Sequence, residues 1–290
     1  MSEVWRAAAR ENLLGEGPVW DARSGRLWWL DIKGLRLEWL SPRDGADGTY
    51  PLEVRASAVA PRRDGALVMA NEHGVAVFDP ASGRMTQRLE LEADRPWNRS
   101  NDGSVDTGGR FWFSTMDDTQ ARRSGAVYRL DPDWSLATMV EGLGIPNTTC
   151  CSPDGRTFYL ADSRDDVLWA YDLDPETGAL GERREFAHTR GLGGSPDGSA
   201  VDADGCLWNA QWGLWRVVRY APDGSIDRIV EMPVEQPSKC AFGGDDLSTL
   251  YVTTARVGLS AEALEKQPWA GSLLAFEPGV QGWAPPPFGG

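Results

Sequence analysis

Basic residues, histidine and long apolar runs are all scarce in this 290-residue sequence. Lysine and arginine total 29 against 43 aspartates and glutamates, which gives a formal net charge of −14. Nucleic acids and anionic membranes recruit basic patches, so this balance argues against both as partners. No apolar run approaches the roughly 18 residues of a membrane-spanning helix. The N-terminus lacks a basic segment followed by an apolar one, and we therefore expect a cytoplasmic protein.

Cysteine is also scarce, and the four cysteines form none of the usual motifs. Cys150 and Cys151 are adjacent, while Cys206 and Cys240 stand alone, so neither a CxxC pair nor the Cys/His spacing of a zinc site is present. We expect buried, reduced thiols. The Gly-x-Ser-x-Gly elbow of α/β-hydrolases is missing as well, which disfavours a hydrolase built on a serine-histidine-aspartate triad.

Helical sequence patterns are rare, whereas turn residues are abundant. Glycine and proline number 33 and 19 and are spread along the chain, which favours many turns over long helices. Only residues 259–266 are typical of a helix, with Ser260 as its N-cap. Apolar residues make up 41% of the chain, so a disordered protein is excluded.

One local pattern recurs six times along the chain, a glycine- or aspartate-containing turn followed by a short apolar strand. Asp-Gly or Ser-Gly between apolar runs is the strongest short-range signal of a β-hairpin, because such turns need a positive φ. Further strands that end in Asp-Pro or a similar turn follow the hairpins. The copies are spaced by 40–49 residues when they are aligned on one apolar residue each, namely Leu27, Leu67, Phe111, Phe158, Leu207 and Leu250.

About four short strands in a unit of this length are typical of a propeller blade. We therefore predict an all-β fold, a six-bladed β-propeller of four-stranded antiparallel blades, with residues 1–290 as a single domain. A β-sandwich array or two small barrels are the alternatives. Since the terminal strands of a closed propeller usually share a blade, we expect residues 4–14 to complete the last one. The proline-rich residues 284–290 are expected to be frayed.

Large polar residues recur at one phase of the repeat, ten or eleven residues before the aligned apolar position. In a propeller this phase opens the innermost strand of each blade, so six such positions face one mouth of the central channel. Carboxylate and amide oxygens that converge there are typical ligands of hard cations. Five repeats carry a large polar residue at this phase, namely Glu16, Asn101, Asn147, Asp197 and Lys239, and the remaining repeat has Ala56 and Ser57.

Other interpretations of this phase remain open. Polar residues often open strands after turns, and each of these could be a solvated loop residue. A protein-interaction scaffold would need no carboxylate cluster, but the paired Gly-His and Trp-Asp signature of such repeats does not recur along the chain. His73 and His188 fall at other phases of the repeat and are not candidate ligands.

The sequence resembles the senescence-marker-protein/gluconolactonase family, which includes regucalcin and bacterial sugar lactonases. Two of the matching blocks are specific, Gly-Glu-Gly-Pro at residues 15–18 and Asn-Arg-Ser-Asn-Asp-Gly at residues 98–103. Further blocks lie at residues 195–198, 242–244 and 251–256, and the resemblance runs from about residue 10 to about residue 280. The resemblance implies a six-bladed propeller that holds one divalent metal at the channel mouth.

The same resemblance implies roles for individual residues. It assigns Glu16, Asn147 and Asp197 as metal ligands and Arg99 and Asn101 as substrate contacts. One departure concerns the metal-binding asparagine, because the family often has Ser-Asn-Gly where this chain has Pro-Asn-Thr at residues 146–148. We expect the loss of glycine to shift the backbone at this position of the pocket. Calcium, magnesium, manganese, zinc and ferrous iron all remain candidate cofactors.

We predict a metal-dependent sugar lactonase that hydrolyses an aldonolactone, of the pentono- or gluconolactone type, to the aldonic acid. Asp197 is the candidate general base, because a carboxylate beside a metal can accept a proton from the attacking water. The alternatives are a calcium-binding regulatory propeller without turnover and a hydrolase of other lactones or esters. We expect a small sugar lactone as the partner, and a monomer or weak homo-oligomer as the assembly.

Two further expectations concern residues beside the candidate site. Among the tryptophans that flank the motif strands, Trp212 and Trp215 are the better candidates for pocket walls, whereas Trp20, Trp112 and Trp208 are expected to pack between blades. Asp102 either contacts the pocket or orients the turn that carries Asn101, and the second interpretation is favoured.

Overall fold

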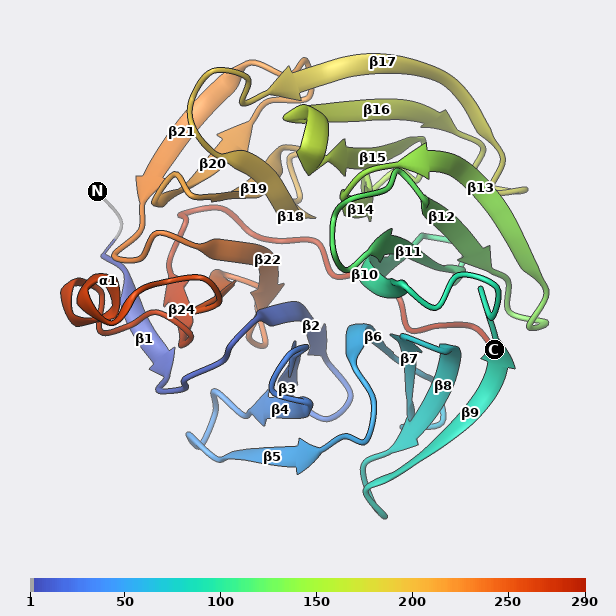
Figure 1. The fold of residues 1–290 in the computed structure, drawn as a ribbon, viewed down its shortest axis with the longest axis horizontal. Coiled ribbons are helices and arrows are strands. Elements are labelled where there is room, and N and C mark those ends of the chain that lie inside the picture. Colours follow the sequence, from blue (N-terminus) through green and yellow to red (C-terminus); the bar gives the residue numbers. More distant parts are fainter. Residues whose placement is uncertain (1–2) are drawn as a thin grey trace.

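The computed structural model describes residues 3–290 and consists of six four-stranded antiparallel sheets placed around one axis (Figure 1). This confirms the predicted six-bladed β-propeller. The first three blades contain β2 (Gly15–Asp21), β3 (Arg26–Asp31), β4 (Arg36–Leu40) and β5 (Asp47–Pro51), then β6 (Ala56–Pro61), β7 (Leu67–Asn71), β8 (Gly74–Asp79) and β9 (Arg84–Glu90), then β10 (Asn98–Val105), β11 (Phe111–Asp117), β12 (Gly125–Leu130) and β13 (Leu136–Leu143).

The other three blades follow around the ring and include the first strand of the chain. They contain β14 (Pro146–Cys151), β15 (Thr157–Asp162), β16 (Val167–Leu173) and β17 (Leu180–His188), then β18 (Ser195–Val201), β19 (Leu207–Trp212), β20 (Arg216–Tyr220) and β21 (Ile226–Glu231), then β22 (Pro237–Gly243), β23 (Thr249–Thr254), β24 (Leu273–Phe276) and β1 (Trp5–Ala8).

The ring is closed by pairing between the two ends of the chain. Strand β1 runs antiparallel to β24, with Trp5 opposite Ala275, so the N-terminal strand is the outer edge of the sixth blade. The expectation that residues 4–14 complete the last blade is therefore confirmed. This pairing covers the outer edge of β24 and links the N-terminal part of the chain to the last blade, which closes the ring.

Buried aspartates hold the inner hairpin turns of the third and fifth blades. In the third blade Asp106 accepts hydrogen bonds from the backbone amides of Gly108 and Arg110 and from Trp112 Nε1. In the fifth blade Asp202 accepts equivalent bonds from the amides of residues 204 and 206 and from the indole of residue 208. One side chain thus satisfies the turn amides and a buried indole, so the hairpin is specified locally.

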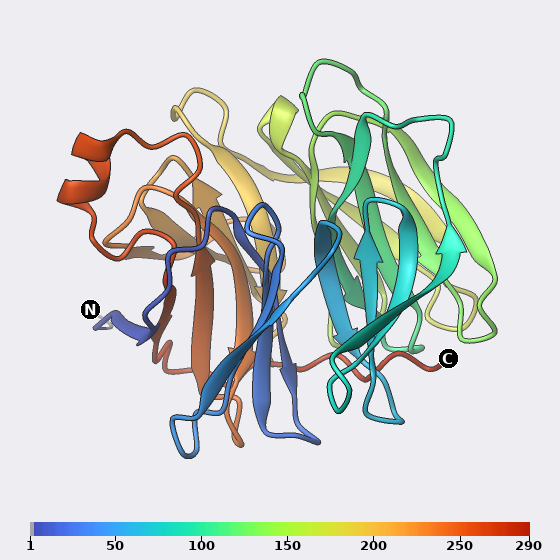
Figure 2. The same ribbon diagram turned by 60° about the horizontal axis from the view of Figure 1, so that its bottom comes forward.

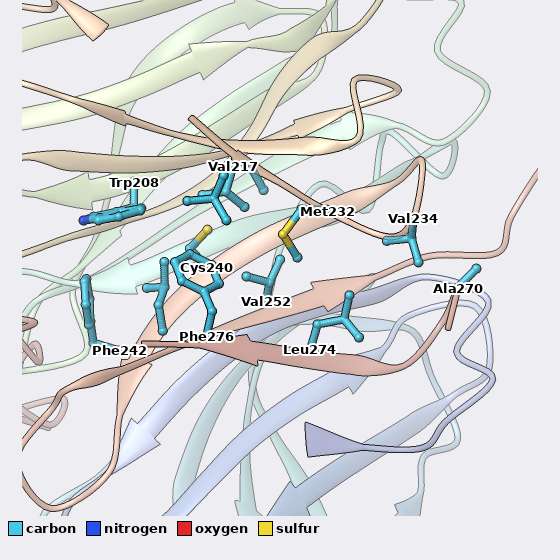
Figure 3. Close-up of a cluster of buried hydrophobic side chains, with 13 residues drawn as sticks. Trp208, Val217, Met232, Val234, Cys240, Phe242, Val252, Ala270, Leu274 and Phe276 are labelled. Atoms are coloured by element: carbon cyan, nitrogen blue, oxygen red, sulfur yellow. The ribbon is translucent and has the colours of Figure 1, made fainter. Parts of the chain in front are cut away.

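The hydrophobic core lies between neighbouring blades. Figure 3 shows one such interface, where Trp208 and Val217 of the fifth blade face Phe242, Val252 and Phe276 of the sixth. The ring centroids of Trp208 and Phe276 lie 5.8 Å apart. Each blade buries its faces against both neighbours. This packing fixes the positions of the inner strands, so that equivalent residues of different blades lie at the same height along the axis.

Each innermost strand carries a β-bulge near its start. The register of the ladder to the second strand shifts after Glu16 in β2, after Ser100 in β10, after Asn147 in β14 and after Pro196 in β18. The inner strands β6 and β22 shift at the same level. A bulge leaves residues unpaired and re-aims their side chains, so the polar residues of this phase lie where the backbone departs from the regular ladder.

Between residues 3 and 290, helical structure is limited to two short segments. The helix α1 (Ala261–Lys266) is capped by Ser260, whose side chain accepts a hydrogen bond from the amide of Ala263, and this confirms the predicted helix within one turn. A single 3₁₀ turn, η1 (Ser163–Asp165), follows β15. Among the described residues no helix has the length and apolar character needed to cross a membrane.

The expectation that residues 284–290 are frayed is wrong. These residues belong to the C-terminal segment, residues 277–290, which crosses the ring from the end of β24 to the opposite blades (Figures 1 and 2). Phe288 is fully buried in the core between the second and third blades, and its amide donates a 2.8 Å hydrogen bond to the carbonyl of Pro61. A proline-rich sequence can donate few hydrogen bonds to a sheet, but burial of one large apolar side chain is enough to fix it against the ring.

Candidate metal and substrate site

All five residues assigned to the site from the sequence line one cavity of about 290 Å³ at a mouth of the channel. Glu16, Asn147, Asp197, Arg99 and Asn101 are each at most 8% exposed. They come from four different inner strands, and the bulges place them at the same level. The rest of the wall is formed by Leu14, Lys33, Met116, Asp118, Gln120, Ile145, Ser163, Ser195, Trp212 and Val257. We refer to this space as the site cavity.

The four ligand-type residues do not occupy equivalent positions in their strands. Glu16 and Asn147 are the last residues paired with the second strand before the bulge, opposite Leu30 and Ala161. Asn101 and Asp197 lie within the unpaired part of the bulge. In the sequence, the polar residue precedes the aligned apolar residue by eleven positions in the first pair and by ten in the second, and this difference reflects the one-residue offset. The site therefore depends on two kinds of backbone position, which only the three-dimensional register separates.

The backbone at the start of these strands requires residues of particular kinds. Gly17 has φ 59, and a Cβ at this position would lie 2.7 Å from the carbonyl oxygen of Ser57 in the next blade. A glycine is therefore needed directly after Glu16. This requirement accounts for the glycine in the Gly-Glu-Gly-Pro motif on physical grounds.

Burial and neighbouring negative charge disfavour the ionised forms of both carboxyl groups of the site. Burial raises the pKa of Glu16 to about 8, and repulsion from Asp102 adds to this. Burial, followed by repulsion from Glu16 and Asp102, raises the pKa of Asp197 well above its ordinary value. Within residues 3–290 neither carboxyl group forms an ion pair with a lysine or arginine. Buried acids without a basic partner need a proton or a cation between them, and the site fits a bound cation.

Asn147 supplies the third oxygen and is held by two hydrogen bonds. Its Oδ1 accepts a 2.8 Å bond from Asn101 Nδ2, and its Nδ2 donates a 2.9 Å bond to Ser163 Oγ. The amide is therefore oriented, and its oxygen keeps a second lone pair for a ligand. No group of three or more histidine, cysteine, aspartate or glutamate side chains forms a metal cluster in the described part of the chain, so the candidate donor set combines two carboxylates with one amide.

Arg99 is fixed in the cavity wall by hydrogen bonds on one side of its guanidinium. Nε donates a 2.7 Å bond to Asp118, and Nη1 donates 2.8 Å bonds to Asn101 Oδ1 and to the Ser100 carbonyl. Burial lowers the pKa of Arg99, and the ion pair with Asp118 opposes this effect. Over residues 3–290, Nη2 has no hydrogen-bond partner, so this nitrogen is available to a polar ligand in the cavity.

Asp118 is a site residue that the sequence reasoning missed. Its carboxylate binds Arg99 Nε through one oxygen and Arg55 Nη1, at 2.8 Å, through the other. Burial alone would raise the pKa of Asp118, but the two arginines lower it below its ordinary value. The available signal was an acidic residue directly after the second strand of the blade that carries Arg99. The missed residues of the wall also include Lys33, Gln120 and Ser163.

Asp102 orients the backbone and does not line the site cavity. Its carboxylate accepts hydrogen bonds from the amides of Gly103, at 2.7 Å, and Thr149, at 3.0 Å, and it forms an ion pair with Lys239. These bonds tie the third blade to the fourth and the sixth. The structure agrees with the favoured interpretation of Asp102 as an orienting residue.

The tryptophan expectations were right in part. Trp212 lines the site cavity, whereas Trp215 does not and is 37% exposed. Trp112 and Trp208 are fully buried and Trp20 is largely buried, each in the core between blades. Trp215 has φ 56, and this left-handed turn separates its side chain from the cavity although only two residues lie between it and Trp212.

The backbone at residue 148 has an unusual conformation, at the position where the sequence departs from the pattern of the family. Thr148 has φ 54, a left-handed conformation that is costly for a β-branched residue. Its hydroxyl compensates by donating to the carbonyl oxygen of Asp197, and it also lies 2.9 Å from Ser199 Oγ. Threonine in place of glycine therefore adds a link between the fourth and fifth blades directly behind the site.

A ring of six blades with acidic and amide side chains at one mouth of the axis defines a class of propeller with a polar axial site. The family described as SMP-30/Gluconolactonase/LRE-like matches residues 14–256. The chain belongs to this family.

Three proteins illustrate the similarity. A 6-deoxy-6-sulfogluconolactonase of Pseudomonas putida is 39% identical over 295 residues and covers all of both chains. An L-arabinolactonase of Azospirillum brasilense is 40% identical over 98% of this chain and 94% of its own. The crystal structure of a calcium-binding protein, regucalcin, from Agrobacterium tumefaciens has a TM-score of 0.92 and 35% identity, and the match covers 98% of this chain and 97% of that one.

Proposed function

We propose that this protein hydrolyses a sugar lactone of the aldonolactone class to the aldonic acid and depends on one divalent metal ion. The observation that carries the proposal is a single cavity containing two unpaired buried carboxyl groups, an oriented amide oxygen and an arginine with a free nitrogen. Two full-length relatives named as sugar lactonases, about 40% identical, support the same substrate class.

Glu16, Asn147 and Asp197 would hold the metal ion in this proposal. When bound, a divalent cation polarises a lactone carbonyl and stabilises negative charge on its oxygen. Calcium, magnesium, manganese, zinc and ferrous iron are all compatible with an oxygen donor set of this kind. The regucalcin structure, named as a calcium-binding protein, makes calcium the first ion to test.

The residues of the cavity have separate roles in the proposed reaction. Asp197 acts as the general base and accepts a proton from the attacking water. The water oxygen bonds to the carbonyl carbon, the ring carbon–oxygen bond breaks, and a proton reaches the ring oxygen to leave a hydroxyl group. Arg99 and Asn101 bind the sugar oxygens, because Arg99 has a free donor and Asn101 is held beside it.

We also propose that the ring acts as one domain, as a monomer or weak homo-oligomer, in the cytoplasm. The proposal of an intracellular location is supported by four free, buried cysteines, since reduced thiols persist in reducing compartments.

A calcium-binding regulatory propeller without turnover is the second candidate function, and the regucalcin relative favours it. Aldonolactone hydrolysis followed with a pH indicator separates the two. We expect the rate to fall to spontaneous ring opening after the protein is stripped by a chelator and to return when a divalent salt is added. Metal binding without a metal-dependent rate would exclude the lactonase and leave the regulatory protein.

A further inference from the structure

Lys239 is a buried cation at the axis that the proposed reaction does not use. Of the three lysines in the chain, Lys33 and Lys266 are exposed, whereas Lys239 is 4% exposed and lies on the innermost strand β22. Its Nζ forms an ion pair with Asp102 and donates a 2.8 Å hydrogen bond to the carbonyl of Gly103. A buried charge is costly unless it is paired, so this cation is held in place by the third blade.

The ion pair lies between the site cavity and a second, smaller space further along the channel. Lys239 and Gly103 line this second space of about 60 Å³, whereas Asn101, two residues before Gly103, lines the site cavity. The stem of Lys239 runs directly against Gly198, where any side chain would collide with it. Since Gly198 follows Asp197, the lysine packs against the backbone of a proposed metal ligand.

The buried charges around the axis do not cancel, because negative charges outnumber positive ones. Glu16, Asp197 and Asp102 contribute three negative charges when ionised, and Lys239 contributes one positive charge. Arg99 and Arg55 in the adjoining wall are balanced by Asp118 and Glu72, with which they form ion pairs. With Glu16 and Asp197 both ionised, as they would be when they hold a cation, the axial group carries a net charge of −2, which one divalent cation neutralises.

We propose that Lys239 is the internal counter-cation of the axial site and makes the site select divalent over trivalent metal ions. The proposal rests on the metal site proposed above and adds a residue that does not touch the metal. Lys239 remains charged in this environment. Burial by itself would lower the pKa of Lys239, but attraction to Asp102 and Glu16 outweighs it and raises this pKa.

The test compares the affinities of the metal-stripped protein for calcium, by calorimetry, and for terbium, by luminescence. Replacing Lys239 by methionine, which has a similar unbranched stem, leaves a site of charge −3. We expect the ratio of terbium to calcium affinity to rise on the order of tenfold or more, since a trivalent ion gains more from the added negative charge. Asp102→Asn leaves a site of charge −1, and the same ratio is expected to fall.

The double variant Asp102→Asn/Lys239→Met restores a charge of −2 and is expected to return the ratio to that of the natural protein. Lys266→Met, which removes an exposed lysine on α1, is the matched control and is expected to leave the ratio unchanged. If Lys239→Met does not fold, Asp102→Asn tests the same charge balance, and the ratio of terbium to calcium affinity is then expected to fall instead of rise. An unchanged ratio in the folded single variants would overturn the role of Lys239, whereas absence of metal binding by the natural protein would overturn the metal site itself.

Discussion

The hydroxyl of Thr148 donates a hydrogen bond to the backbone carbonyl oxygen of Asp197, and so joins the fourth blade to the fifth directly behind the candidate metal ligands. Asn209 Nδ2 donates a 2.9 Å bond to the same carbonyl and a 3.0 Å bond to Ser199 Oγ. Asp197 is therefore held through its backbone by side chains from two blades. This network makes Thr148 a positioning residue for the proposed base.

Changes at Thr148 should separate backbone strain from the loss of this hydrogen bond. Thr148→Val keeps the strained β-branched residue at φ 54 but removes the hydroxyl, and we expect a loss of about 2 kcal/mol in unfolding free energy. Thr148→Gly removes strain and hydroxyl together and should cost less. Urea unfolding measures both. A valine variant as stable as the natural protein would show that the hydroxyl does not hold the two blades together.

Replacement of Asp197 by asparagine should abolish most of the activity. The change keeps the size of the side chain and removes its capacity to accept a proton, so we expect turnover at saturating metal to fall at least about 100-fold. Asp133→Asn, in an exposed turn, is the control and should retain full activity. Turnover near that of the natural protein in the Asp197 variant would remove this residue from the mechanism.

Arg99→Ala should weaken substrate binding while the metal site is retained. The substitution removes the free nitrogen that faces the cavity but no proposed metal ligand, so we expect KM to rise about tenfold or more and metal affinity to change little. Arg43→Ala, at a side chain that is 76% exposed, is the control. If metal binding is lost with unchanged KM, Arg99 supports the metal ligands and not the substrate.

The C-terminal segment should contribute strongly to stability. Phe288 is fully buried, and Phe288→Ala leaves a cavity that we expect to cost about 3–5 kcal/mol in unfolding free energy. Val280→Ala, at a half-buried position of the same segment, should cost much less. Thermal and denaturant unfolding of both variants measure this difference. Equal stability of the two variants would mean that the segment is frayed in solution.

Much of the site could be predicted because its residues belong to a repeated local pattern. Glu16, Asn147 and Asp197 each open an inner strand at nearly the same distance before a hairpin turn, and the fold brings such positions to one axis. Asp118 could not be found in this way, since it follows a second strand and lies outside the inner-strand phase on which the repeat was aligned. Asp118 belongs to the site because the guanidinium of Arg99 points toward it, and this side-chain direction cannot be read from the neighbouring sequence.

The sequence by itself determined the hairpins, their number and the level of the polar residues, because Asp-Gly turns and strand patterns act over a few neighbouring residues. Only the tertiary structure decided that Lys239 reaches Asp102, 137 residues away, and that Phe288 anchors the final segment across the ring. Contacts of this kind depend on how the blades close around the axis. The packing of all six blades sets that closure, and no single segment contains it.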